Sequence, residues 1–149
     1  SGGHGALSVD VSSTQGLSVP SLSEQVQNEI KEKLSSSIQT IASIANPIDL
    51  TGSAVDDDFV AAANGLSITP EIDCIIVLLL PYLPGITSDL GARLSQISRR
   101  AEKPLVAYVP HVEKYRMLIE GFEFNRVPVS PSIEGAVHMA EAMRRCQPC

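Results

Sequence analysis

The sequence contains an uninterrupted apolar run from Cys74 to Leu80, and this run constrains the fold more than any other feature. A strand with one solvent-exposed face alternates apolar and polar residues, whereas a strand covered on both faces is apolar throughout. The run therefore predicts a buried strand at a central position of a parallel sheet. It is far shorter than the ~20 apolar residues that a membrane-spanning helix needs.

Helical and extended patterns alternate along the rest of the chain, which is typical of an α/β fold. Besides the strand at 74–80, we expect an extended piece at 17–20, a second buried strand at 105–109 and an edge strand at 126–129. Six helices are expected. The first covers 4–15 and ends at Gly16, and the second follows the capping-box pair Ser21 and Glu24, with Val26, Ile30, Leu34 and Ile38 on one face. The third follows Asp56-Asp57-Asp58, the fourth has Leu90, Leu94, Ile97 and Ala101 on one face, the fifth covers 111–120 and ends at Gly121, and the sixth has Ser130 as its cap and Pro131 at its first position.

These elements predict an open parallel sheet with helices on both faces, and the flavodoxin-like strand order 2-1-3-4-5 fits them. The Gly-rich start of the chain normally follows a strand, and no strand precedes it in the sequence. In that strand order the missing first strand is central, and a four-stranded remnant leaves a slot with unpaired backbone groups. We therefore expect residues 1–149 to form one domain of a larger multidomain protein, or to borrow a strand.

Composition excludes several classes of function. Lys plus Arg is 11 and Asp plus Glu is 17, so the net charge is −6, and aromatic residues make up 4%. This balance argues against nucleic-acid and anionic-membrane partners, which require a clustered positive field. The three cysteines are too few for a disulfide scaffold, and together with the absence of a signal-peptide pattern they favour a reducing, cytoplasmic location. We interpret Cys74 as a small buried hydrophobe, and Cys146-Gln147-Pro148-Cys149, which follows a helix, as neither a redox motif nor a metal site.

The segment Ser1-Gly2-Gly3-His4-Gly5 opens the first predicted helix. Glycines allow a ligand to approach the backbone, and the first amides of a helix are unpaired, so the segment is a candidate anion site. The alternative is a tight strand-to-helix turn that needs positive φ. Neither the Walker spacing nor the dinucleotide fingerprint is present. For His4, an exposed turn residue or an extra donor to an anion is favoured over a catalytic role.

Two further loops are expected at the same edge of the sheet as this turn. They are Asn46-Pro47-Ile48-Asp49-Leu50-Thr51-Gly52 and Leu80-Pro81-Tyr82-Leu83-Pro84-Gly85-Ile86. Loops that converge on a helix N-terminus support a ligand site better than any one of them alone, although ordinary turn chemistry also accounts for them. His111 and His138 are interpreted as surface or structural residues, because no carboxylate accompanies either of them at metal-ligand spacing.

Five segments resemble, in order along nearly the whole chain, the NDP-forming acyl-CoA synthetases. Ser1 to Asp10 is similar to the family's N-A/S-G-G-P-G-x-x-x-x-D segment, and Ala45 to Gly52 is similar to its G-N-P-V-D-L-T-G, the most specific match. The strand sequence Glu71 to Leu80 resembles E-V-D-A-V-L-V, Lys103 to Ala107 resembles K-P-V-V-A, and Val127 to Val137 resembles I-P-V-Y-x-T-P-E-x-A-V. His4 departs from the pattern, because the family usually has Pro there.

The resemblance implies the succinyl-CoA-synthetase-like flavodoxin domain that follows the family's phosphohistidine domain. It implies a phosphate-facing turn at Gly2, Gly3, His4 and Gly5, and we place Asn46, Pro84 and Gly85 on the acyl-phosphate side. The family converts acyl-CoA, phosphate and ADP to a free acid, CoA and ATP.

The resemblance also implies that the chain's partners are the CoA-binding, phosphohistidine and ATP-grasp domains of the same enzyme, and that CoA, ATP or ADP, and Mg belong to those other domains. We expect no catalytic residue, no metal and no cofactor on this domain, and no activity from it alone. The alternatives are a non-catalytic docking module and a flavin-binding flavodoxin, for which only Tyr82 supplies a nearby aromatic.

Overall fold

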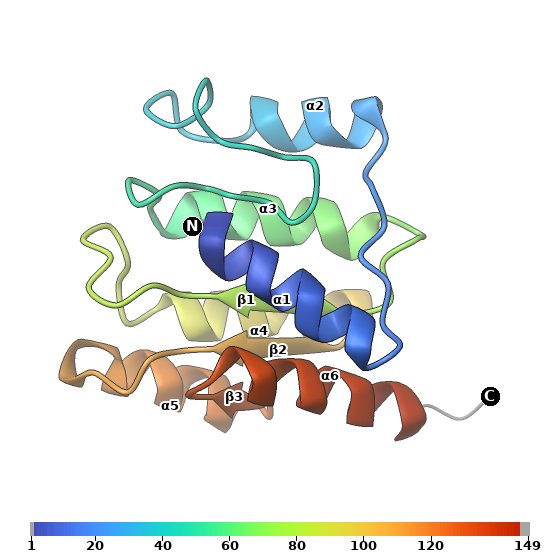
Figure 1. The fold of residues 1–149 in the computed structure, drawn as a ribbon. Coiled ribbons are helices and arrows are strands. Elements are labelled where there is room, and N and C mark those ends of the chain that lie inside the picture. The colour runs from blue at the N-terminus through green and yellow to red at the C-terminus, as the bar shows by residue number, and fades with distance from the viewer. Residues whose placement is uncertain (1, 147–149) are drawn as a thin grey trace.

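The computed structural model describes residues 2–146, and these residues form a three-stranded parallel sheet between two layers of helices (Figure 1). The strands β1 (Ile75–Leu78), β2 (Leu105–Tyr108) and β3 (Val129–Ser130) lie in that order. Ile75 pairs with Leu105, and Ala107 pairs with Val129. The predicted α/β class is confirmed, with an open parallel sheet consistent with a flavodoxin-like fold.

Two strand predictions need correction. The central strand of the described sheet is β2, whereas β1, which was expected at the centre, lies at the edge. The segment 17–20 forms no strand in the structure, so the sheet has three strands where four were expected. The apolar character of β1 reflects helices on both of its faces, and that character alone does not require strands on both of its edges.

The helices cover both faces of the sheet. α1 (Gly2–Thr14) and α6 (Ile133–Cys146) lie together on one face. The helices α3 (Asp56–Ile68), α4 (Leu90–Ala101) and α5 (Arg116–Phe124) cover the other, and α2 (Glu24–Glu32) packs against α3 (Figure 1). No helix in the described part of the chain is long and apolar enough to cross a membrane.

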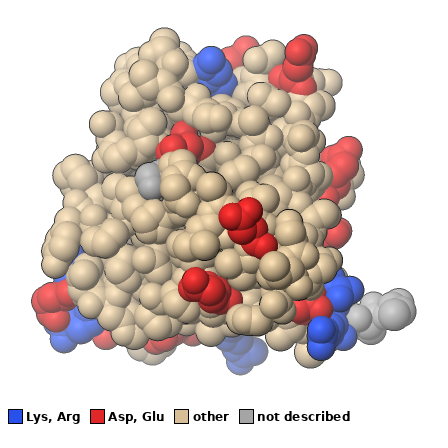
Figure 2. Space-filling view, viewed as in Figure 1, with Lys and Arg blue, Asp and Glu red and all other residues tan. Residues whose placement is uncertain are grey.

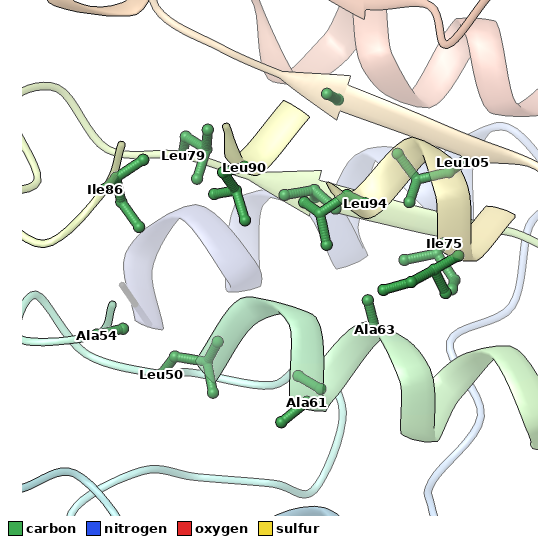
Figure 3. Packing of buried hydrophobic residues seen from close by; sticks show 14 of the residues in the cluster. Leu50, Ala54, Ala61, Ala63, Ile75, Leu79, Ile86, Leu90, Leu94 and Leu105 are labelled. Carbon is green, nitrogen blue, oxygen red and sulfur yellow. The ribbon is translucent and has the colours of Figure 1, made fainter. Parts of the chain in front are cut away.

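Successive side chains of the strands point to opposite faces and enter two apolar clusters. Ile75 and Leu105 join the larger cluster, in which Ala63 of α3 and Leu94 of α4 face β1 (Figure 3). Val106 points to the other face and packs with Ala136 and Ala140 of α6. The larger cluster holds most of the buried hydrophobic residues and fixes the sheet against α3, α4 and α5.

The end of α1 matches its prediction. Gly16 has a φ of 75°, the amide of Leu17 donates to the carbonyl of Ser12 at 2.9 Å, and the amide of Gly16 donates to the carbonyl of Ser13 at 3.2 Å. This is the Schellman pattern, which ends a helix at a residue with positive φ. The helix therefore turns back along the sheet at a defined point.

Other helix boundaries differ from their predictions. The cap of α2 is Ser23, whose Oγ accepts from the amide of Val26, and not Ser21. That helix ends at Glu32, so Leu34 and Ile38 enter the core from turns that follow it.

Near the C-terminus, α5 continues through Gly121 instead of ending there. Ser132, not Ser130, accepts at the start of α6, because the amide of Gly135 donates to its Oγ at 3.0 Å. Gln147, Pro148 and Cys149 of the Cys-x-x-Cys segment lie outside the described residues, as does Ser1 of the Gly-rich segment.

Candidate functional site at the carboxyl edge of the sheet

The first turn of α1 contains the Gly-rich segment and lies at the carboxyl edge of the sheet. The His4 ring stacks on the ring of Tyr108, the last residue of β2, with 5.9 Å between the centroids and 30° between the planes. Gly2, Gly3 and Gly5 are helical, and Gly16 is the positive-φ glycine within 2–146, so the alternative of a tight turn with positive φ does not describe this segment. The first amides of α1 have no acceptor within their own helix.

The three glycines have different surroundings. A Cβ at Gly5 would lie 3.2 Å from Cγ of Pro47, and one at Gly2 would lie 3.4 Å from Oδ2 of Asp49. A Cβ at Gly3 would meet no atom within 4 Å. The close approach of α1 to the 46–52 loop therefore needs a small residue at position 5, whereas position 3 faces open space from which a ligand can approach.

The 46–52 loop is held in place by its own hydrogen bonds. The peptide bond between Asn46 and Pro47 is cis, and Nδ2 of Asn46 donates to the carbonyl of Pro20 at 2.8 Å. Ser43 and Asp49 exchange two backbone hydrogen bonds, and Oδ1 of Asp49 accepts from the amide of Thr51. Asn46 thus anchors this loop to the segment that follows α1.

The 80–86 loop is anchored by Tyr115, the last residue of the short 3-10 helix η1 (Glu113–Tyr115) that precedes α5. The Tyr115 hydroxyl donates to the carbonyl of Leu80 at 2.6 Å and accepts from the amide of Leu83 at 2.9 Å. Gly85 packs on the 54–55 backbone, because a Cβ there would lie 2.6 Å from the carbonyl oxygen of Ala54. Pro84 is exposed.

A groove of about 320 Å³ lies between α1, the 46–52 loop, β1 and the 80–86 loop, and we call it the β1 groove. Gly5, Asn46, Leu80 and Leu83 line it near the carboxyl end of β1. Gly2, Gly3, His4, Pro84 and Gly85 do not line it. The structure therefore brings Gly5 and Asn46 together on one groove, whereas Pro84 and Gly85 of the 80–86 loop lie outside its lining.

The electrostatics of this face are acidic. Figure 2 shows several acidic side chains on the face that carries α1, with basic side chains only at its margins. The carboxylate of Asp49 beside Gly2 adds negative charge at the N-terminus of α1, where the helix dipole favours it. An anion at this turn would be held by backbone amides without help from Lys or Arg side chains.

The other histidines and Cys74 form no metal-binding cluster among the described residues. His111 and His138 are exposed, and no group of three or more metal-binding side chains occurs within residues 2–146. Burial and, second, the charge of Asp73 raise the pKa of the Cys74 thiol to about 11, which makes it a poor nucleophile at neutral pH. Sequence reasoning missed Asp49, Tyr108 and Tyr115 as contacts of the site. Only Asp49 lay in a segment already singled out.

Solved structures share this arrangement of elements. A dinucleotide-forming acetyl-coenzyme A synthetase 1 from Ca. Korarchaeum cryptofilum in its apo form is 24% identical over 97% of this chain and 31% of that chain, with a TM-score of 0.77. Its complex with phosphate and ADP gives 23% identity over 100% of this chain and 34% of that one, with a TM-score of 0.71. PH0766 from Pyrococcus horikoshii OT3 is 25% identical over 95% of this chain and 33% of its own, with a TM-score of 0.81.

The chain has the fold of one part of these proteins. It spans about a third of the length of each structure that it matches. No family model and no curated protein matches the sequence.

Proposed function

We propose that this chain is the flavodoxin-like domain of an NDP-forming acyl-CoA synthetase, and that the first turn of α1 faces a phosphoryl group. The observation that carries the proposal is the fold match along nearly the whole chain to a part of an acetyl-coenzyme A synthetase. The five sequence segments that resemble the synthetase family lie along the same length and in the family's order. The other domains of such an enzyme would bind CoA and the nucleotide.

The geometry of α1 supports the phosphoryl role. The helix begins at the carboxyl edge of an open parallel sheet, where ligands of such folds bind. A helix N-terminus favours an anion, and the open space at Gly3 gives that anion a path to the backbone. Backbone amides of this kind stabilise developing phosphoryl charge without a covalent step.

The acidic surroundings predict weak binding of free phosphate. Asp49 lies beside Gly2, α1 contains no Lys or Arg, and the basic side chains of this face lie at its margins (Figure 2), so the described site offers little of the Coulomb attraction that most phosphate sites use. We therefore propose that the turn receives a phosphoryl group presented by another domain. Pro84, Gly85 and Asn46 remain our proposal for the acyl-phosphate side, with Asn46 acting through the position of its loop.

The second candidate is a docking module without a phosphate site. The acidic face in Figure 2 favours it, because acidic side chains repel free anions but can pair with basic side chains of a partner. The flavin alternative has less support, because Tyr82 is 69% exposed and is not among the residues that line the β1 groove.

A phosphate titration of ¹⁵N-labelled chain separates these candidates. Under the proposal, high concentrations of phosphate shift the amides of Gly2, Gly3 and Gly5 more than those of the rest of the chain, with the weak affinity expected for an acidic face, and FMN at equal concentration produces no such shift. In the Gly3→Val variant the shifts are lost, whereas in the matched Ala6→Val variant, at an exposed position of the same helix, they persist. Equal shifts in wild type and Gly3→Val would refute the site.

Phosphate that leaves all three amides unmoved in a folded chain favours the docking module. The deciding test is then the assembled enzyme. There Gly3→Val should slow phosphoryl transfer while Ala6→Val should not.

A further inference from the structure

Tyr82 is held in a backbone conformation that a bulky side chain disfavours. Its φ is 59°, in the left-handed region that glycine adopts freely and in which a tyrosine is an outlier. Glu102 has a similar φ of 52°, but it is the residue that ends α4, where a left-handed residue closes the helix. No helix of residues 2–146 ends at Tyr82, so the conformation of this tyrosine needs another reason.

The 80–86 loop is held in this conformation from two sides. The amide of Leu83 donates to the Tyr115 hydroxyl at 2.9 Å, and Nζ of Lys114 donates to the carbonyl of Leu83. On the other side, Gly85 packs so closely on the segment ahead of α3 that a Cβ there would lie 2.6 Å from a carbonyl oxygen. Strained residues persist where their surroundings fix them in this way, and they gather at functional sites.

The side chain that this loop presents is exposed. Tyr82 is 69% exposed, so most of its surface is uncovered by its own chain. Pro81 and Pro84 of the same loop are exposed as well, and Val55, which packs on Gly85, is 38% exposed. We call Val55, Pro81, Tyr82 and Pro84 the Tyr82 patch. Contiguous exposed apolar patches mark interaction sites, and tyrosine is enriched among the residues that dominate binding energy.

The shape of the Tyr82 patch favours a protein over a small ligand. Small molecules bind in concave sites, whereas Tyr82 lines neither the β1 groove nor the smaller groove between α2 and α3. The loop that follows β1 projects from the carboxyl edge of the sheet (Figure 1). A projecting ring can enter a pocket on a partner, which is how aromatic anchors bind in protein interfaces.

The charges beside the Tyr82 patch indicate the polarity of this partner. The three aspartates of 56–58 open α3 directly after Val55, and Asp89 is exposed just ahead of α4. They outnumber the neighbouring cations Arg93, which pairs with an aspartate of α3, and Lys114. Because opposite charges face one another across interfaces, a net negative rim favours a partner with basic side chains around its pocket.

The Tyr82 patch lies next to the candidate phosphoryl site. Leu80 and Leu83 of its loop line the β1 groove together with Gly5 of α1. A protein docked on the loop therefore reaches the first turn of α1. The acidic surroundings of that turn favour a phosphoryl group held by a partner over free phosphate, and a docking surface beside the turn supplies the hold.

We propose that the Tyr82 patch docks the domain that presents the phosphoryl group to α1, and that the Tyr82 ring enters an apolar pocket with a basic rim on that domain. The identity of the partner rests on the proposed function, whereas the docking surface does not. Tyr82 is a positioning residue, because it acts through the placement of the partner and touches no reacting atom.

Nitration of tyrosine by tetranitromethane, read by mass spectrometry, tests the docking. Tyr82 is 69% exposed and Tyr115 is 1% exposed, so the second serves as an internal reference. In this chain alone, Tyr82 should be nitrated much faster than Tyr115. In the assembled enzyme, nitration of Tyr82 should slow by roughly tenfold or more, because the centre of an interface excludes water. Nitration of Tyr115 should stay slow in both.

Two glycine variants separate docking from stability. Tyr82→Gly and Glu102→Gly each replace a left-handed side chain by a residue that adopts this conformation without strain, so neither should lower the urea midpoint of the chain. In the assembled enzyme, Tyr82→Gly should slow phosphoryl transfer by roughly tenfold or more, as the loss of an aromatic anchor does. Glu102→Gly should keep the wild-type rate. Tyr82→Phe, which keeps the ring, should restore most of the rate.

Four results overturn the proposal. One is equal nitration of Tyr82 in the chain and in the assembled enzyme, and another is a wild-type transfer rate in Tyr82→Gly. The third is protection in the chain alone that rises with its concentration, which assigns the patch to a second copy. The fourth is protection of the chain alone by acetate or acetyl phosphate, which assigns it to a small ligand.

The same experiment distinguishes this proposal from the proposed function. Protection of Tyr82 in an assembly that forms no ATP from acyl-CoA, phosphate and ADP would reject the synthetase and leave the docking surface. An active enzyme in which Tyr82 is nitrated as fast as in the chain alone would reject the docking surface and leave the synthetase.

Discussion

Gly5 lies directly against the ring of Pro47, so that a Cβ at position 5 would be 3.2 Å from Cγ and 3.3 Å from Cβ of that proline. This contact seats the first turn of α1 on the 46–52 loop. Nδ2 of Asn46 donates to the carbonyl of Pro20, and Ser43 pairs with Asp49 through two backbone hydrogen bonds, so the loop is held in place beside Gly5. The contact explains why one glycine of the segment is needed for packing, whereas Gly3 has open space around it.

The glycines therefore respond differently to alanine. We expect Gly3→Ala to leave the free energy of unfolding unchanged or to raise it by up to about 1 kcal/mol, because alanine loses less backbone entropy in a helix. We expect Gly5→Ala to lower it by about 1 kcal/mol or more, because the added methyl group overpacks the contact with Pro47. Urea titrations of the two variants measure both changes. Equal effects at the two positions would show that the contact does not limit α1.

The class of fold and the buried strands β1 and β2 could be predicted from the sequence, because apolar runs and helical spacing report burial directly, whereas the order of the strands and the absence of a strand at 17–20 could not. Gly121 shows where such local reasoning fails. It was expected to end a helix, but it lies inside α5 at a close crossing, where a Cβ would be 3.3 Å from the amide nitrogen of Ala92 in α4. The need for a small residue comes from another helix, so the local sequence does not reveal it.

The candidate site, too, could be predicted only in part from the sequence. The convergence of α1 with the 46–52 loop followed from the placement of loops at the carboxyl ends of strands. The contacts that fix the geometry join residues far apart in the sequence, such as Asn46 with Pro20 and Tyr115 with Leu80 and Leu83. No motif marks these partners, and Tyr115 was assigned only to a helix.

A second prediction concerns Asp58, whose side chain is fully buried. Its carboxylate accepts from the amide of Ser35 at 2.8 Å, from the hydroxyl of Ser35 at 3.0 Å and from the amide of Val55 at 2.9 Å. Asp58→Ala leaves these donors without an acceptor, and we expect a loss of about 2–4 kcal/mol in the free energy of unfolding. Thermal and urea unfolding both measure it.

The matched control is Asp57→Ala, one position earlier in the same helix. The Asp57 side chain is 79% exposed and pairs with Arg93 at 2.7 Å, so its removal should cost no more than about 1 kcal/mol. If the two variants lose the same stability, the charge at the N-terminus of α3 matters and the buried hydrogen bonds of Asp58 do not.

A third prediction concerns acid. Hydrogen bonds from Arg144 and Arg145 lower the pKa of Glu141 to about 2, from the ordinary value of 4.5. A carboxyl group whose pKa is lower in the folded state binds fewer protons there, so its stabilising effect is present above pH 4.5 and is lost as the pH falls toward 2. The urea midpoint should therefore fall less between pH 6 and pH 3 in Glu141→Gln than in wild type. Glu120→Gln, at an exposed position of α5, should keep the wild-type pH dependence.

A fourth prediction concerns Tyr115, which holds the 80–86 loop. Tyr115→Phe removes the hydroxyl that joins Leu80 and Leu83, and we expect about 1–3 kcal/mol of lost stability, because a buried amide and a partly buried carbonyl lose their partner. Burial raises the pKa of this tyrosine, so its folded state keeps the proton longer than its unfolded state. Stability should then fall as the pH rises above about 10, and less steeply in the phenylalanine variant. Denaturation at pH 8 and pH 10.5 compares the two, and identical slopes would contradict the burial of this hydroxyl.

The last prediction uses Cys74 to report on the β1 groove. Its pKa is raised to about 11 because burial disfavours the thiolate and Asp73 repels it. A thiol whose pKa is higher in the folded state makes stability fall as the pH rises from about 9, its unfolded value, toward 11. The pH dependence of the alkylation rate of Cys74 in a Cys146→Ser and Cys149→Ser background should give a midpoint near that pKa, because only the thiolate form reacts. Asp73→Asn should lower the midpoint by less than the burial contributes, since burial is the larger cause. A midpoint near the ordinary value in wild type would show that water fills the groove around Cys74 and that its apolar lining does not desolvate the thiol.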